Sequence, residues 1–235
     1  MRKYTKKVTT QKIEEVFESN DISKLYGKSF ITSWNGKTSD TNEEYQEIFA
    51  EYIFHRLVDN KLPMLAPSGI ENYCEHERTY VKRDNEEGVQ RDYYFGKRKL
   101  DDSYGVPVWF ELQTGEKGQG KGIDLIYCNN NTQELNIFEL KYNSTEPLLR
   151  AILEIQTYYQ RVNWIKAFSD LKQARENKDK ISCAGISKIN KYILVNKGCA
   201  HLYNKYEAIK DSTDSYVKKL LDYFEIKVLI YANCK

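Results

Sequence analysis

The chain has 235 residues, 40% of them hydrophobic, which suits one ordinary domain with a packed core, so we do not expect intrinsic disorder. Its 36 basic and 34 acidic residues leave a formal net charge of +2, so any site for a polyanion must be local. The five cysteines have no paired spacing, and no segment resembles a signal peptide or a membrane span, so we predict a cytoplasmic protein with reduced thiols and no membrane partner.

Residues 1–38 are predicted to form an N-terminal adjunct, with a helix over 10–19 and a strand over 29–34. The main domain is predicted over 39–235. It begins with a helix over residues 39–59, where Ser39 and Asp40 can cap the first turn. The polar and aromatic segment that follows, 70–105, suggests a hairpin or a long loop.

Three strand-like runs come next, separated by turn residues, with the sequences VPVWFELQTG, GIDLIYC and LNIFELKY. A long helical pattern covers residues 145–176, and a short strand, KYILVN, comes after it. A helix over 206–223 and a last strand, KVLIYAN, complete the pattern. This order predicts an α/β fold whose mixed central sheet is flanked by helices.

Charged residues interrupt two of these strands at positions that should be buried. Side chains alternate along a strand, so Glu139 and Lys141 point the same way, and Leu140 points to the other face. Asp124 lies on the preceding strand, and pairing of the two strands through their Asn-rich turn places it beside Glu139. Isolated charges in a core are costly unless they are paired or bind a metal. The sequence therefore predicts a site with two acids and a lysine.

Asp124 followed by Glu139-Leu140-Lys141 across a hairpin, with helices before and after, resembles the PD-(D/E)xK nuclease superfamily. The likeness covers about residues 40–165, and it departs from the family name in having Ile123 where the proline stands. It implies a restriction-endonuclease-like αβββαβ core, here followed by an extra helix and strand. It also implies a Mg²⁺-dependent nuclease, acting on DNA rather than RNA, in which Mn²⁺ can replace Mg²⁺.

The resemblance assigns a role to each of these residues. Asp124 and Glu139 are expected to ligate the metal, and Lys141 to position or activate the attacking water. Carboxylates suit this chemistry because they hold divalent cations against a phosphate that gains charge in the transition state. The resemblance also allows a homodimer.

Two helical residues complete the expected site. Related nucleases often add a glutamate from the helix before the sheet, which implies Glu44 as a further metal ligand and catalytic residue. RecB-like members carry a Gln and a Tyr in the helix after the lysine, which implies a catalytic role for Gln156. A helical wheel places Gln156 on the apolar side of its helix and places Arg150 and Glu154 on a solvated side.

Simpler readings remain open for these features. Glu139 and Lys141 can form an ordinary ion pair at solvent-exposed strand ends, and Glu44 can be a solvated helix residue. Glu111 is interpreted as a strand-end residue in solvent, and the Gly-rich loop 115–122 as a flexible turn. The alternative function is a catalytically inactive module on the same fold that binds nucleic acid or protein. The basic run Lys97 to Lys99 favours nucleic acid as its partner.

Overall fold

The structure is a computed structural model, and it describes residues 14, 41–59, 69–70, 72–74, 80–114, 122–144, 146–196 and 198–231, apart from the side chains of residues 41–45 and 176. The predicted N-terminal adjunct lies outside this part of the chain, except for Glu14, whose carboxylate pairs with Arg56 of the first described helix. The loop over 115–121 also lies outside it.

A five-stranded mixed sheet forms the centre of the molecule, with its strands in the order β1-β2-β3-β4-β5. Neighbours are antiparallel from β1 to β3 and parallel from β3 to β5, so the sheet changes direction at its central strand. The strands are β1 (Val106–Gln113), β2 (Gly122–Asn129), β3 (Glu134–Lys141), β4 (Lys188–Asn196) and β5 (Ile226–Tyr231). All five strands predicted for the main domain are confirmed, as is the α/β class with a mixed sheet.

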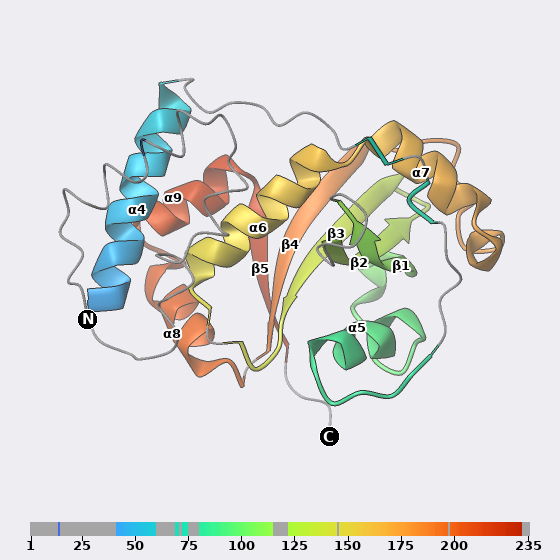
Figure 1. Ribbon diagram of the computed structural model, residues 1–235, viewed down its shortest axis with the longest axis horizontal. Helices are drawn as coiled ribbons and strands as arrows, with labels where there is room; N and C mark the ends of the chain where they lie inside the picture. The colour runs from blue at the N-terminus through green and yellow to red at the C-terminus, as the bar shows by residue number, and fades with distance from the viewer. Residues whose placement is uncertain are drawn as a thin grey trace.

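Helices cover both faces of the sheet (Figure 1). One face carries α6, which crosses β2, β3 and β4, together with the other helices of the larger core. The opposite face is covered by α5, whose apolar side chains pack on β1, β2 and β3. The helices are α4 (Thr41–Val58), α5 (Glu86–Tyr94), α6 (Leu148–Arg161), α7 (Trp164–Gln173), α8 (Ala200–Ile209) and α9 (Tyr216–Tyr223).

The helix predicted over 39–59 is confirmed as α4, but α5 lies where the sequence suggested a hairpin or loop. The side chain of Asn85 caps α5 by accepting a hydrogen bond from the Gly88 N–H, and two glutamates occupy the first turn, where the helix dipole favours them. Val89, Tyr93 and Tyr94 then pack against the sheet. The helix has only 9 residues, too few for a clear apolar period, so tertiary contacts define it.

The two long C-terminal helices of the sequence prediction are each broken in two. The helix over 145–176 is interrupted at Val162, whose backbone is extended, and Asn163 then caps α7 through a hydrogen bond from the Lys166 N–H. The helix over 206–223 is likewise split into α8 and α9, with Ser215 capping α9. Both breaks occur at polar capping residues, which compete with continued helix formation.

Alternation along β3 decides which side chains reach which face. Leu135 and Ile137 belong to the core beneath α6, and Phe138 and Leu140 to the core beneath α5. The predicted alternation is therefore confirmed, and Glu139 lies on the α6 side of the sheet.

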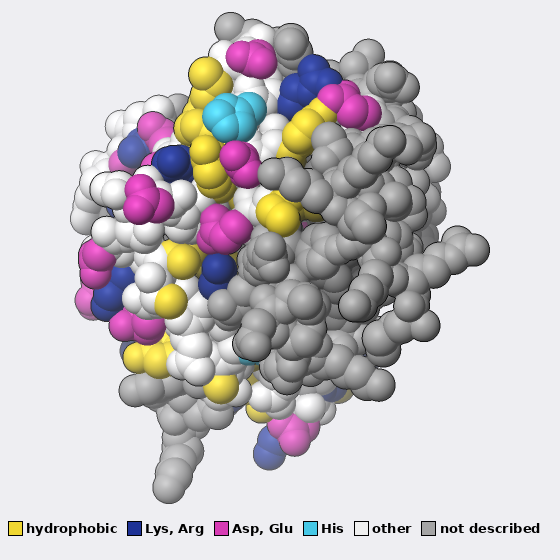
Figure 2. All heavy atoms as spheres, turned by 90° about the vertical axis from the view of Figure 1, so that its left-hand side faces the viewer, with side chains coloured by type: hydrophobic (Ala, Val, Ile, Leu, Met, Phe, Trp, Pro, Cys, Tyr) yellow, Lys and Arg dark blue, Asp and Glu magenta, His cyan; other side chains and the backbone are white. Residues whose placement is uncertain are grey.

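The surface that α4 and α9 share is chemically mixed. Acidic, basic and apolar side chains lie next to one another among the coloured atoms of Figure 2, which matches the near-neutral net charge of the chain. No helix in the described ranges is both long and apolar enough to cross a membrane.

Candidate functional site

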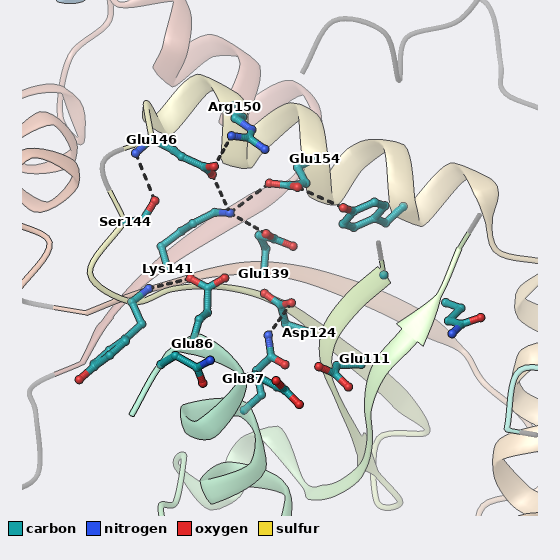
Figure 3. Close-up of a pocket in the computed structure, with 16 residues that line it drawn as sticks. Glu86, Glu87, Glu111, Asp124, Glu139, Lys141, Ser144, Glu146, Arg150 and Glu154 are labelled. Atoms are coloured by element: carbon teal, nitrogen blue, oxygen red, sulfur yellow. Dashed lines mark hydrogen bonds and ion pairs between the residues drawn. The ribbon is translucent and has the colours of Figure 1, made fainter. Parts of the chain in front are cut away.

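A pocket of about 680 Å³ opens at the end of the sheet where β2 begins and β3 ends. Its walls are α5 on one side and α6 on the other, as Figure 3 shows. Among the described residues, carboxylates dominate the lining and two basic side chains face them. The acids are Glu86, Glu87, Glu111, Asp124, Glu139, Glu146 and Glu154, and the bases are Lys141 and Arg150.

Strand pairing brings Asp124 to Glu139, as predicted. Leu125 pairs with Phe138 in the antiparallel register of β2 and β3, so Asp124 lies opposite Glu139 one position further along. Asp124 Oδ2 accepts a hydrogen bond of 2.6 Å from the Leu140 N–H. Burial, reinforced by the charge of Glu86, raises the pKa of Asp124 well above its usual value, although Lys141 opposes the shift.

Glu139 is more deeply buried than Asp124, with 4% of its surface exposed. Its Oε1 accepts a hydrogen bond of 2.7 Å from Lys141 Nζ, whereas its Oε2 is buried and has no hydrogen-bond partner in the described part of the chain. Burial and the nearby Asp124 raise the pKa of Glu139 well above its usual value. A buried carboxylate oxygen without a donor is costly, and a bound cation could supply the missing partner.

Three carboxylates surround the Lys141 ammonium group. Its Nζ donates to Glu139 at 2.7 Å, to Glu154 at 3.0 Å and to Glu146 at 3.2 Å. Burial favours the neutral amine, but these carboxylates outweigh it and raise the pKa of Lys141 well above its usual value. Lys141 is therefore an ammonium, and its three N–H bonds are all used.

The sequence analysis placed Glu154 on a solvated helix face, and this is wrong. Glu154 is buried, with 7% of its surface exposed, and accepts a hydrogen bond of 3.1 Å from the Tyr158 hydroxyl in addition to that from Lys141. Burial alone would raise the pKa of Glu154, but the charges of Lys141 and Arg150 lower it. Glu154 and Tyr158 are four residues apart in α6, so they lie on the same side of the helix, and this spacing was the available sequence signal for the pair.

Helix α5 supplies two further side chains to the pocket. They were not predicted from the sequence because the helix itself was not predicted. Glu86 Oε2 accepts a hydrogen bond of 3.0 Å from the Tyr142 N–H, and burial raises the pKa of Glu86. Gln90 Nε2 donates to Asp124 Oδ1 at 2.7 Å. Asn85 followed by two glutamates was the available sequence signal for this helix.

The side chain of Glu44 lies outside the described residues, so its predicted role stays a prediction. Its helix, α4, packs against α9, and Glu47 one turn later accepts hydrogen bonds from the Ser215 hydroxyl and the Tyr216 N–H at the start of α9. Of the two described α-helices that precede the sheet in the sequence, α5 is the one that borders the pocket.

Gln156 is buried in α6, as its apolar surroundings predicted, but it does not line the pocket. Its Oε1 accepts a hydrogen bond of 2.9 Å from Lys191 Nζ, which lies 4.5 Å from the centre of the Tyr159 ring. Burial lowers the pKa of Lys191 to about 8. The structure therefore brings Asp124, Glu139 and Lys141 together and leaves Gln156 with a different partner.

Glu111 was interpreted as a strand-end residue in solvent, and this too is wrong. It lies inside β1, is half-buried and lines the pocket. Its φ of 52° is in the left-handed region. Strand β1 also carries a register shift between Pro107 and Trp109, so simple alternation does not predict which way each of its side chains points.

The donor atoms in the pocket are of the kind that hard divalent cations bind. The described part of its lining is rich in carboxylate oxygens and contains no histidine or cysteine, and oxygen donors are what Mg²⁺ and Mn²⁺ prefer. Nowhere among the described residues are three or more His, Cys, Asp or Glu side chains already gathered as a cation-binding group. A cation between Asp124 and Glu139 would therefore need neutral oxygen ligands or water as well.

Comparison of the chain with protein families, with curated proteins and with solved structures found no match.

Proposed function

We propose that the chain is a metal-dependent nuclease with a restriction-endonuclease-like core, in which Asp124 and Glu139 hold Mg²⁺. The sheet order supports this core: an antiparallel meander carries the acids, and a parallel extension follows on the other side of β3. The helices before and after the meander form the walls of the pocket. DNA is the proposed substrate because the resemblance is to nucleases of that class.

The observation that carries the proposal is the unpaired Oε2 of Glu139, buried opposite Asp124. Two carboxylates with raised pKa values repel each other when both are ionised, and among the described residues of their pocket Lys141 is the one positive side chain that forms a hydrogen bond with either of them. A divalent cation would satisfy the free oxygen and neutralise both acids. It would also bring positive charge to a phosphate that the surrounding acids would otherwise repel.

Lys141 acts in this proposal as a fixed positive charge. Because its pKa is raised well above the usual value, it is not a neutral general base at any pH near 7. An ammonium group beside the scissile phosphate stabilises the charge that develops in the transition state, and it can donate a hydrogen bond to the attacking water once one of its three carboxylate partners gives way. Glu146 and Glu154 keep the group in place from the α6 side.

The direct test is cleavage of single-stranded and double-stranded DNA, and of RNA, with Mg²⁺ or Mn²⁺. Wild type should cut only with the cation, and Asp124→Ala and Lys141→Ala should each lose 100-fold or more of the rate, the order of magnitude expected for a group that stabilises transition-state charge. Glu207→Gln, which alters an exposed ion pair with Lys210, is the matched control. Unchanged cutting by both pocket variants would refute the proposal.

A second candidate is an inactive module that binds nucleic acid. It is favoured by the way the three carboxylates occupy every N–H of Lys141, which leaves none for a substrate in the described state. Exposed Lys97 and Lys99 could then contact phosphates. This candidate predicts salt-dependent binding without cleavage under any metal condition. The cytoplasmic location and the homodimer also stay predictions.

A further inference from the structure

Gln90 contacts the candidate metal site but is not one of the residues to which the proposed function assigns a role. It lies in the middle of α5, has 5% of its surface exposed and lines the pocket. Its Nε2 donates to Asp124 Oδ1 at 2.7 Å. A glutamine this deeply buried needs partners for both ends of its amide.

The contact with Asp124 fixes the orientation of the amide. In this contact the amide nitrogen is the donor, so Asp124 does not use the amide oxygen of Gln90. That oxygen, Gln90 Oε1, is buried and has no hydrogen-bond partner in the described part of the chain. Two side chains that line the pocket, Gln90 and Glu139, therefore each have a buried oxygen without a donor among the described residues.

The chemistry of the free oxygens is complementary to one kind of ligand. Mg²⁺ and Mn²⁺ prefer about six oxygen ligands, and side-chain amide oxygens serve alongside carboxylates in such sites. Asp124 and Glu139 supply two carboxylates, and the described residues offer no third acid already gathered with them. A neutral oxygen also adds a ligand without adding repulsion between negative charges.

We propose that the amide oxygen of Gln90 is a third protein ligand of the divalent cation, beside Asp124 and Glu139. This inference rests on the cation site of the proposed function but not on cleavage. One side chain then serves the site twice: its nitrogen orients Asp124 and its oxygen binds the ion.

The experiment uses Tb³⁺, a hard cation that binds oxygen ligands and whose luminescence lifetimes in H₂O and D₂O give the number of bound waters. Tyr142 and Tyr158 line the pocket and can sensitise the emission. Competition with Mn²⁺ then gives the affinity for the smaller ion. The full-length wild type is compared with Gln90→Met, which removes both amide functions at similar volume, and with Gln90→Glu, which restores an oxygen ligand.

Gln46→Met is a close control. Gln46 is also a buried helical glutamine, 7% exposed, and its Oε1 also has no hydrogen-bond partner in the described ranges, but it lies in α4 and does not line the pocket. Thermal unfolding of each variant without metal verifies that it is folded. The control therefore separates loss of a ligand from the general effect of placing methionine at a buried glutamine.

The inference predicts that Gln90→Met gains about one bound water and loses about 10-fold in Mn²⁺ affinity, since one oxygen ligand is replaced by solvent. Gln90→Glu should return the hydration number to the wild-type value, and Gln46→Met should change neither quantity. Wild-type hydration and affinity in Gln90→Met would overturn the inference, as would equal losses in Gln90→Met and Gln90→Glu, which would mean that Gln90 only orients Asp124.

These outcomes are separable from those of the proposed function. A chain that binds the ion through Gln90 and cuts no nucleic acid would refute the nuclease and leave this inference standing. If the chain is a metal-dependent nuclease but the ion bound to Gln90→Met has the wild-type number of waters, the nuclease is supported and the role of Gln90 as a ligand is refuted.

Discussion

Lys141 Nζ lies 3.0 Å from Glu154 Oε2, although the two residues belong to a strand and to the helix that follows it. The pair is enclosed, with 5% and 9% of the two side chains exposed. It joins the central strand of the sheet to the helix that crosses it, and so connects the candidate chemistry to the packing of α6 on β3.

Glu154→Gln tests this connection. The amide still accepts a hydrogen bond but no longer carries a charge, so Lys141 keeps two carboxylates and loses the third. We expect unfolding in urea to become easier by about 1–3 kcal/mol, the range for a buried hydrogen bond to a charged group. If cleavage is found, its rate constant should fall more than KM rises, because Lys141 acts in the transition state.

Glu146→Gln provides the comparison, because Glu146 is half-buried and its contact with Lys141 is longer, at 3.2 Å. Its effect on stability should be smaller than that of Glu154→Gln. A larger effect would mean that Glu146, rather than Glu154, is the main partner of Lys141.

Asp124→Asn should stabilise the protein when no metal is present. The folded state raises the pKa of Asp124, so it binds a proton that the unfolded state has already released, and wild-type stability falls as pH rises above the normal value of 3.8. Asparagine has no such cost, and its NH₂ group can donate to Gln90 Oε1 once the Gln90 amide turns over. We expect a gain of about 1–2 kcal/mol at pH 8, which corresponds to about 2–8 °C in Tm.

The measurement is thermal unfolding in EDTA at pH 4 and at pH 8. The advantage of the variant over wild type should be small at pH 4 and grow toward pH 8. The same gain at both pH values, or a loss at pH 8, would show that ionised Asp124 is not a source of instability in the folded state.

Lys191→Met should also be stabilising, for the opposite reason. Burial lowers the pKa of Lys191 from 10.5 to about 8, so below about pH 8 the folded protein carries a buried ammonium that the unfolded chain holds in water. Wild-type stability from this group therefore rises between about pH 8 and 10.5. Because methionine leaves Gln156 Oε1 without its donor, we expect a net gain at pH 7 of only about 1–2 kcal/mol.

Denaturant curves of Lys191→Met and wild type at pH 7 and pH 10 would check this prediction. The difference between the two proteins should shrink at the higher pH. The same samples test Gln156, because Lys191→Met removes the hydrogen bond that Gln156 Oε1 accepts. Cleavage should persist if Gln156 has no part in the chemistry.

Gly122→Ala should separate β1 from β2 beside the site. A Cβ atom on Gly122 would lie 2.1 Å from the backbone oxygen of Leu112, so the two strands would have to move apart at the position that precedes Asp124 by two residues. Overpacking of this kind costs about 1–3 kcal/mol or more. Urea unfolding should show that loss, and Mn²⁺ affinity should fall with it.

Gly185→Ala is the control, because a Cβ atom there meets nothing within 4 Å. Its unfolding curve and its metal affinity should match those of wild type. If Gly122→Ala behaves in the same way, the close approach of the two strands is not needed for the pocket.

The strands of the site were predictable because alternation with a period of two is a local property. It identified the faces of Glu139 and Leu140 and the position of Asp124 across the hairpin, all of which the structure confirms. The register follows from the turn between the strands, which the asparagines indicate. No knowledge of distant residues was needed for this part of the site.

The helical part of the site was not predictable by the same reasoning. A wheel assumes that a helix has one solvated face, but every residue of α6 from Ala151 to Tyr158 is buried, because the helix lies between the sheet and the helices α8 and α9. Glu154 was therefore read as solvated. In α5, by contrast, the helix is short and polar, and only its contacts with the sheet reveal that Gln90 faces Asp124.

All the described residues that line the pocket come from one continuous stretch of the chain, from Asn85 to Tyr158. Within the described structure, β4, β5 and the C-terminal helices support this stretch without lending a side chain to the cavity. Substitutions in those supporting segments should therefore reach the cavity indirectly, through the pairing of β4 with β3 and the packing of α6 on β4.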